Sequence, residues 1–450
     1  MSSTIGRLLE EEQWSGTLLP IFLILAACTH RVDLPLVGCA YQTYPLRVDA
    51  RTGSPMRSGG QDFESVLRAA MSAPAAPGPG LVGTARPSVL ILSGGSQNGA
   101  FGAGFFAGLS RVPEYKLVTG VSTGALQSTF LFLANRPVPA DRTYPSYFPD
   151  ASSTPHTNVG DLALAYSIER ESDLIRVGSG GQLGGVIRGS IGTFGPLRAT
   201  LRGLLSRDTL LQVGRDYRDD PAQGRRLLVG VTNVSDGAGY AIDLTELASR
   251  LERGGAPYPL VRDCYVEALV ASSSVPVAAL PVALEARGPD GRLTRDLYID
   301  GGARFGVFWS QLGEVLAGGL SPDVTLIVNG SLYGKPWLDN AGHPRRDWSA
   351  LTLALRSVSI LENQVYRFSV DNVTRAASGD GSIRMAFISN EGTTDAGKDP
   401  LDFRFDGRTC REWNDVDNRS KPTEFHPRYM RCLLEYGRDR GRRLAWNRQR

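Results

Sequence analysis

One serine in this sequence, Ser122, has a glycine two residues before it and another two residues after it, and this pattern marks a candidate nucleophile. The segment Gly120-Val121-Ser122-Thr123-Gly124 fits the pattern G-x-S-x-G, and it follows an apolar stretch and opens a helix-forming one. Glycines two residues before and after a serine let the chain turn tightly between a strand and a helix, so that the hydroxyl projects at the positive end of the helix. Ser122 is therefore the candidate nucleophile, and a chance match in a turn is the alternative.

A glycine-rich loop upstream of this serine could stabilise an oxyanion. Gly94, Gly95, Ser96 and Gly99 follow an apolar run that predicts a buried strand. Consecutive glycines permit positive φ angles that turn several N–H groups into one concavity. A dinucleotide-binding loop fits less well, because the next strand ends at Ser122 and not at an acidic residue that would hold a ribose. A purely structural turn is the remaining alternative.

A carboxylate stands at the end of a third apolar segment. Residues 297–299 read Leu-Tyr-Ile and lead directly into Asp300, Gly301 and Gly302. An acidic side chain at a strand end before two glycines is held in a defined place by the turn. Without other motifs, such an Asp would more often be one that only caps a turn. The serine turn and the glycine loop in the same chain favour a functional interpretation.

In this order the three motifs resemble the patatin-like phospholipases, a family with a G-G-G-x-x-G loop, a G-x-S-x-G turn and a D-G-[AG] turn. Residues 231–234 (Val-Thr-Asn-Val) and 271–276 (Ala-Ser-Ser-Ser-Val-Pro) are also similar to family segments. The resemblance covers about residues 88–306 well and 307–440 loosely. It implies an α/β fold of three layers, with a mostly parallel central sheet and helices on both faces.

The resemblance also implies the chemistry. Asp300 would orient Ser122 or accept its proton, and the serine would attack an ester carbonyl to give an acyl-enzyme that water hydrolyses. The amides of Gly94, Gly95 and Ser96 would hold the oxyanion. The implied activity is that of a carboxylic ester hydrolase of lipids, phospholipase A-like or lysophospholipase-like, without metal or other cofactor.

One departure from the family pattern concerns the glycine loop. Ser96 stands where the family usually has a third glycine, and Gln97 and Asn98 stand where a basic residue is common. A Cβ at positive φ costs about 1 kcal/mol. This departure motivates an alternative from another class, a catalytically weak lipid-binding envelope lipoprotein on the same fold.

A Ser-Asp-His triad of the α/β-hydrolase type is the mechanistic alternative. It requires a histidine after the acid, and His343 satisfies that order. However, His343 lies in the polar, turn-like stretch 339–344. We expect surface or structural roles for His156, His343 and His426, which favours the dyad.

These groups must be positioned by alternating strands and helices of one hydrolase domain over residues 88–440. The stretch 135–215, rich in Pro, Gly, Ser and Arg, is predicted to be an insertion and a candidate lid. Residues 28–87 are predicted to be a tether and linker, with a Pro/Gly run at 73–80 and a short amphipathic helix at 62–71. Apolar runs predict strands at 89–92, 116–121, 226–231, 241–244, 297–299 and 324–328, and helices at 100–109, 123–133, 260–271 and 351–370.

The N-terminus carries a targeting signal. Residues 18–27 form an apolar run that is too short to span a bilayer but suits a signal peptide. The stretch 25–28, Leu-Ala-Ala-Cys, resembles the lipobox of bacterial lipoproteins, which implies removal of residues 1–27 and acylation of Cys28. We therefore expect the protein to be anchored in the bacterial cell envelope with its folded part facing the periplasm. The outer membrane is favoured over the inner membrane. A buried structural helix is the alternative.

Composition bounds the remaining functions. Charged residues make up 21% and apolar residues 42% of the sequence, as in ordinary globular proteins. The net charge of only +3 does not indicate a nucleic-acid-binding protein. Arginines concentrated after residue 437 predict a solvated helix end. Cys39, Cys264, Cys410 and Cys432 lack metal-ligand spacing; Cys410 and Cys432 could pair in an oxidising compartment, or both thiols could be free.

Overall fold

The structure is a computed structural model of the 450-residue chain. It describes residues 34–46, 63–72, 86–149, 155–177, 190, 192–220, 223–276, 278–288, 290–308, 322–330, 332, 346, 350–376, 382–388, 403–419 and 425–449. Cys28 with the predicted lipobox, the run 73–80 and His343 lie outside the described residues. None of the described helices is both long enough and apolar enough to cross a membrane.

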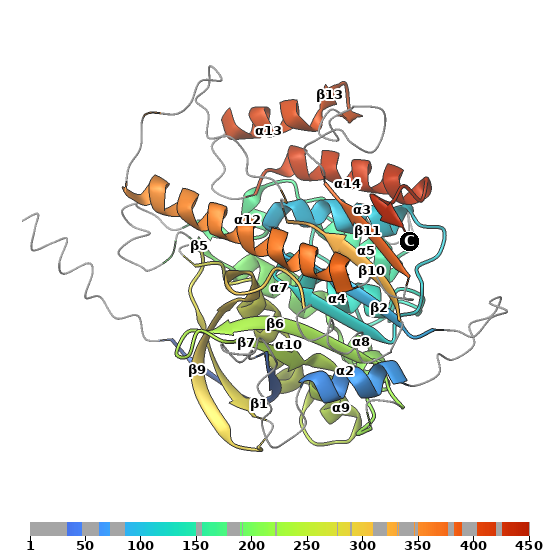
Figure 1. Ribbon diagram of the computed structural model, residues 1–450, viewed down its shortest axis with the longest axis vertical. Coiled ribbons are helices and arrows are strands. Elements are labelled where there is room, and N and C mark those ends of the chain that lie inside the picture. Colours follow the sequence, from blue (N-terminus) through green and yellow to red (C-terminus); the bar gives the residue numbers. More distant parts are fainter. Residues whose placement is uncertain are drawn as a thin grey trace, which may run out of the picture.

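A ten-stranded sheet runs through the centre of a mixed α/β fold (Figure 1). All six predicted strands belong to it. Its strands are, in spatial order, β14 (Arg448–Gln449), β11 (Ile383–Phe387), β10 (Asp323–Val328), β2 (Ser88–Leu92), β3 (Leu117–Val121), β6 (Arg226–Asn233), β7 (Gly239–Asp243), β1 (Leu36–Pro45), β8 (Val282–Arg287) and β9 (Leu293–Asp300).

The sheet is parallel only in part, which qualifies the prediction of a mostly parallel sheet. Strands β11, β10, β2, β3 and β6 pair in parallel. They include nearly continuous apolar runs, as expected for strands buried on both faces. Beyond β6 the pairings β6–β7, β7–β1 and β8–β9 are antiparallel, and β9 returns to pair with β6. The predicted strands at 241–244 and 297–299 therefore belong to an antiparallel region.

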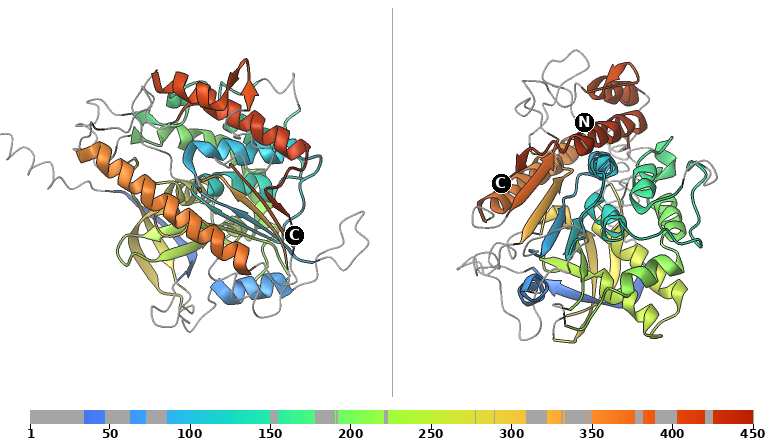
Figure 2. Two further views of the ribbon diagram at one scale, coloured as in Figure 1. Left: turned by 45° about the horizontal axis from the view of Figure 1, so that its top comes forward. Right: turned by 90° about the vertical axis from the view of Figure 1, so that its right-hand side faces the viewer.

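Alternate side chains of the strands enter two separate cores. Val89 and Ile91 of β2 belong to a core shared with α2 (Phe63–Ser72) and α12 (Ala350–Ala376). Leu90 and Leu92 belong to the other core, with α3 (Gly99–Gly108), α4 (Thr123–Phe132), α10 (Tyr258–Ser272) and α14 (Pro427–Arg442). Because successive side chains of a strand point to opposite faces, helices cover both faces of the sheet. Figure 2 shows α2 and α12 on one side and the cyan to green helices on the other.

The remaining described elements include α7 (Gly195–Leu204), α8 (Arg207–Gly214) and α9 (Leu244–Glu252), whose buried side chains belong to the same core as α3, α4 and α10. Within its described residues the predicted insertion contains three α-helices and a short 3₁₀ helix, and the described part of the C-terminal region adds a further α-helix. The other elements are α5 (Asn158–Ala165), η2 (Glu171–Asp173), β4 (Arg176–Val177), β5 (Gly192–Thr193), β12 (Arg404–Phe405), β13 (Arg408–Thr409) and α13 (Cys410–Arg419).

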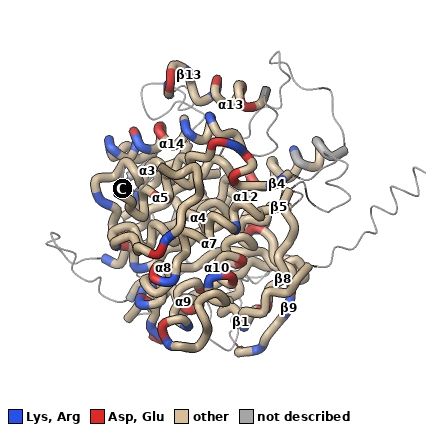
Figure 3. Tube along the Cα trace, turned by 180° about the vertical axis from the view of Figure 1, so that it is seen from behind, with Lys and Arg blue, Asp and Glu red and all other residues tan. Residues whose placement is uncertain are grey.

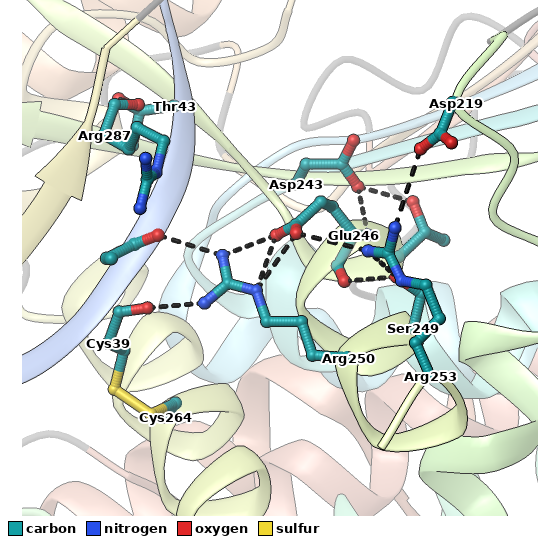
Figure 4. A network of polar contacts seen from close by, with 12 residues as sticks. Cys39, Thr43, Asp219, Asp243, Glu246, Ser249, Arg250, Arg253, Cys264 and Arg287 are labelled. Atoms are coloured by element: carbon teal, nitrogen blue, oxygen red, sulfur yellow. Dashed lines mark hydrogen bonds and ion pairs between the residues drawn. A yellow bond between two sulfur atoms is a disulfide. The ribbon is translucent and has the colours of Figure 1, made fainter. Parts of the chain in front are cut away.

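The N-terminal stretch contributes a strand and a docked helix, whereas residues 28–87 were predicted to be a tether and linker. Strand β1 pairs with both β7 and β8. A disulfide joins its Cys39 to Cys264 of α10, and Arg250 of α9 donates to the Cys39 carbonyl (2.6 Å) while it pairs with Glu246 (Figure 4). The predicted amphipathic helix is α2, whose Phe63 is 1% exposed.

The C-terminal region packs on α3. Helix α14 lies along α3, and a disulfide between Cys410 and Cys432 ties α13 to α14 (Figure 1). Helix α14 carries several arginines and two acidic residues, Glu435 and Asp439 (Figure 3). Arg443, which follows the helix, pairs with Asp439 (2.5 Å). Arg440 is 2% exposed and donates to the Ala445 carbonyl (2.8 Å). The predicted solvated helix end is therefore partly packed against the body.

Candidate active site

Ser122 lies in a tight turn between β3 and α4, the strand-turn-helix context that the sequence predicts. Its φ of 54° and ψ of −125° fall in a region that residues other than glycine rarely adopt. A methyl group on Gly120 would lie 2.4 Å from the Gly124 carbonyl oxygen, and one on Gly124 would lie 2.5 Å from the Leu92 oxygen. Only glycine fits at these two positions, so the turn itself requires both glycines of the motif.

The register of β6 brings the predicted carboxylate to this serine. Along one edge of β6, Val121 pairs with Gly230, and Asp300 pairs with the next residue, Val231. Strands β3 and β9 thus meet end to end on the same edge of β6. Ser122 follows Val121 directly, so two residues that are far apart in sequence become neighbours at one point of the sheet.

The Asp300 carboxyl is buried and only half satisfied. Its Oδ1 accepts a hydrogen bond from the Gly302 amide (2.7 Å), at the start of η3 (Gly301–Ala303). Its Oδ2 has no partner within the described part of the chain. Burial raises the pKa of Asp300 to about 7, although the Ser122 hydroxyl and the Gly302 amide, which favour the ionised form, oppose the shift. A carboxyl with this pKa can exchange a proton near neutral pH.

The backbone of the serine turn is held by a residue that sequence reasoning did not single out. The Ser122 amide donates to Ser272 Oγ (3.1 Å), and the Ser272 hydroxyl donates to the Gly230 carbonyl (2.6 Å). Ser272 is fully buried at the end of α10. The similarity of residues 271–276 to a family segment pointed to this stretch, but not to the hydrogen bonds that Ser272 makes.

The predicted oxyanion loop runs from β2 into η1 (Ser96–Asn98) and α3. Gly95 has a φ of 149°, and a methyl group on it would lie 2.4 Å from the backbone carbon of Asn329. Ser96 adopts a φ of 49°, so the serine that replaces a glycine does take up a positive φ. No described residue accepts a hydrogen bond from the amides of Gly94 or Gly95. These N–H groups remain available for a ligand oxygen.

Neighbouring strands and helices support this loop. Ser93 Oγ donates to the Gly94 carbonyl (2.7 Å) and accepts from the Asn329 amide at the end of β10 (2.8 Å). Gln97 Oε1 accepts from the His426 amide at the start of α14 (2.9 Å). The loop is thus fixed from two sides, by contacts between residues far apart in sequence that no local pattern reveals.

An apolar cavity opens at Ser122. Ser96, Ser122 and Ser273 are among its lining residues, and helices α5 and α7 from the predicted insertion form much of its wall. The insertion therefore covers the site in this structure. Its apolar lining consists chiefly of Leu126, Phe130, Leu162, Ala165, Tyr166, Leu174, Ile175, Phe194, Leu197, Leu201, Leu204, Val275, Phe425 and Met430.

The described histidines have partners other than the dyad. His156 contacts Asp161 through Nδ1 and stacks on Tyr144. His426 Nδ1 bonds to Asn414 Oδ1 (2.7 Å). Over the described ranges, no cluster of three or more His, Cys, Asp or Glu side chains could hold a metal ion.

Comparison with known proteins finds a family model that matches the central part of the chain. The family model of patatin-like phospholipases matches residues 90–311, which include all three motifs. Comparison with curated proteins gives no match. The crystal structure of VipD from Legionella pneumophila is similar at 13% identity with a TM-score of 0.27, over 80% of this chain and 66% of that chain. The chain thus spans just under two thirds of VipD, and a TM-score this low supports no argument about function.

Proposed function

We propose that this protein is a serine hydrolase that cleaves carboxylic esters of lipids through a Ser122–Asp300 dyad. The match of residues 90–311 to the family model of patatin-like phospholipases supports this proposal. One observation carries the proposal. Strands β3 and β9 meet end to end on β6. Ser122 therefore lies beside a buried carboxyl whose Oδ2 has no partner among the described residues, and it lines an apolar cavity.

Acylation begins with attack of Ser122 Oγ on the ester carbonyl carbon. The serine proton passes to Asp300, whose Oδ2 has no other partner among the described residues. The pKa of about 7 supports this role, because an ordinary carboxylate is too weak a base for a serine. When the tetrahedral intermediate collapses, the bond to the leaving oxygen breaks and Asp300 returns the proton to that oxygen.

Negative charge on the carbonyl oxygen needs donors that are already in place. The amides of Gly94 and Gly95 have no acceptor among the described residues, and Ser96 adopts a positive φ beside Ser122. Each such donor contributes about 10²- to 10³-fold to the rate in enzymes of this kind. In deacylation, a water molecule gives a proton to Asp300 and attacks the acyl carbon. When this second intermediate collapses, the bond to Ser122 Oγ breaks, Asp300 returns the proton to Oγ, and the acid leaves.

The cavity supports a lipid as substrate. Its lining is largely apolar, with a few serine, threonine and tyrosine hydroxyls, which suits a hydrocarbon chain and not a polar acyl group. An acyl chain placed there would leave its carboxyl carbon at Ser122 and its alcohol portion outside. Phospholipid and lysophospholipid esters both meet this requirement.

Release of fatty acid from defined lipids tests the function. Purified wild-type protein should release fatty acid from a phospholipid or a lysophospholipid and should hydrolyse a short-chain p-nitrophenyl ester. Ser122→Ala and Asp300→Asn should abolish both activities, while His156→Ala should retain them. A wild-type protein that binds the lipid without turnover contradicts the proposal and favours the lipid-binding alternative.

For location, we propose a periplasm-facing protein anchored through acylated Cys28. The disulfides Cys39–Cys264 and Cys410–Cys432 support an oxidising compartment, because such bonds persist there. Metabolic labelling with a radioactive fatty acid should mark the wild-type protein and not Cys28→Ala. Equal labelling of both would contradict this anchor.

A further inference from the structure

Tyr366 of α12 reaches the reaction centre from the sheet face opposite the apolar cavity. Its ring fills a slot between two glycines. A methyl group on Gly306 would lie 2.4 Å from the ring Cδ1, and one on Gly330 would lie 2.9 Å from Cδ2 on the other edge. Ser369, one turn further along α12, accepts a hydrogen bond from the Gly306 amide (3.0 Å). The helix is therefore fixed where the tyrosine enters.

The Tyr366 hydroxyl ends among the groups assigned to catalysis. The position that a Cβ of Gly94 would occupy lies 2.2 Å from Tyr366 Oη and 3.0 Å from Ser122 Cβ. The equivalent position on Gly302 lies 3.2 Å from Tyr366 Oη and 3.0 Å from Asp300 Oδ1. One hydroxyl thus borders the oxyanion loop, the serine and the carboxylate turn together.

This hydroxyl has no hydrogen-bond partner within the described part of the chain, although Tyr366 is only 6% exposed. A phenylalanine would fill the same slot with its ring, so the hydroxyl adds to this position a hydrogen-bond donor that packing alone does not need. Burial, and to a lesser extent the neighbouring Asp300, raise the pKa of Tyr366 well above its ordinary value. The phenol therefore stays protonated at neutral pH and acts as a donor.

We propose that Tyr366 is a third catalytic residue, whose hydroxyl donates a hydrogen bond to the leaving oxygen of the ester. The inference rests on the proposed hydrolase function. Because Asp300 must return its proton to the leaving oxygen, that oxygen has to lie beside the Asp300–Gly302 turn, which Tyr366 Oη borders. Tyr366 does not line the apolar cavity, so it does not contact the acyl chain. The carbonyl oxygen has its proposed hydrogen-bond donors in the amides of the glycine loop.

The step balances without a net proton transfer from the tyrosine. As the tetrahedral intermediate collapses, the carbon–oxygen bond breaks and its electron pair stays on the leaving oxygen. The proton that Ser122 gave to Asp300 then moves to this oxygen, and the Tyr366 hydrogen bond stabilises the negative charge while it develops. The phenol keeps its own proton throughout.

Esters that share an acyl group but differ in their leaving group distinguish a donor to the leaving oxygen from a residue that is needed only for structure or for acyl binding. For Tyr366→Phe, kcat/KM for an alkyl ester such as ethyl butyrate should fall about 10- to 100-fold, the effect of one hydrogen bond to a charged oxygen. For p-nitrophenyl butyrate it should fall less than about threefold, because nitrophenolate leaves without a donor. The acyl group is the same in both, and kcat/KM reports acylation even when deacylation limits kcat.

The matched control is Tyr41→Phe, which removes a hydroxyl that donates to the Cys264 carbonyl (2.7 Å) far from the dyad in the sequence and on another strand. It should leave the ratio of the two kcat/KM values unchanged. Should Tyr366→Phe fail to fold, 3-fluorotyrosine at position 366 keeps the shape and strengthens the donor, and should raise the alkyl-to-aryl ratio.

An equal loss on both esters, no loss on either, or an unchanged ratio with 3-fluorotyrosine would overturn the role of Tyr366 while leaving the hydrolase function intact. A wild-type protein that hydrolyses neither ester overturns the proposed function, and this inference with it.

Discussion

Replacing Asp300 by asparagine should remove activity and, at the same time, stabilise the protein above neutral pH. The pKa of this carboxyl is about 7 in the folded protein and 3.8 when unperturbed, chiefly because the group is buried. A pKa that is higher in the folded state means that the stability contributed by protonated Asp300 is fully present below pH 3.8 and is lost as the pH rises to about 7.

The size of this effect follows from the shift. Each pKa unit corresponds to about 1.4 kcal/mol. Because Asp300 ionises more readily in the unfolded chain than in the folded protein, its titration lowers the free energy of unfolding by about 2 kcal/mol at pH 5 and about 4 kcal/mol at pH 8. Asp300→Asn cannot ionise, and its amide oxygen can still accept from Gly302. Its free energy of unfolding relative to wild type should therefore increase by about 2–3 kcal/mol between these pH values.

Urea unfolding of both proteins at pH 5 and pH 8 measures this difference, and ester hydrolysis should fall about 10²- to 10⁴-fold in the same variant. The control is Asp161→Asn, which removes a buried carboxylate paired with Arg142 (2.8 Å) and should destabilise at both pH values by about 3–5 kcal/mol. A stability difference for Asp300→Asn that does not change with pH would refute the argument that Asp300 is buried at a cost in order to act as a base.

Three further predictions concern the base, the loop and the N-terminal strand. The kcat/KM of wild type should rise with pH through a single ionisation near the Asp300 pKa of about 7, and a flat profile from pH 5 to 9 would contradict this base. Ser96→Gly should raise the free energy of unfolding by about 1 kcal/mol, because it removes a Cβ at positive φ, and should not slow hydrolysis; a loss of stability in thermal unfolding would contradict the strain. Cys39→Ser should lower the free energy of unfolding by about 2–4 kcal/mol in non-reducing buffer. If adding a reductant does not change the unfolding midpoint of the wild type, the bond to Cys264 is not stabilising.

The sequence predicts the elements around the motifs because their patterns are local. The apolar runs of β2, β3, β6 and β10 mark buried strands, and the helices that follow β2 and β3 begin within a few residues of the predicted positions. A strand with an irregular pattern escapes this reasoning. Strand β1 contains a register shift and a positive φ at Ala40, so its residues do not alternate regularly between buried and exposed.

The geometry of the candidate site depends on contacts that no local pattern contains. The meeting of β3 and β9 on β6 is a matter of register between strands far apart in sequence. The same holds for Ser272 on the Ser122 amide and for the bond between Cys39 and Cys264. Tyr366 occupies an ordinary buried position in a long helix, and only the fold brings its hydroxyl to the dyad.

Covalent labelling of Ser122 tests the central claim most directly. A fluorophosphonate reacts with a serine only when the hydroxyl is activated and an oxyanion site receives the phosphonyl oxygen. Mass spectrometry of the digested wild-type protein should find the adduct on the peptide that contains Ser122, and Ser122→Ala and Asp300→Asn should remain unlabelled. An unlabelled wild type, or an adduct on another serine, would contradict the account.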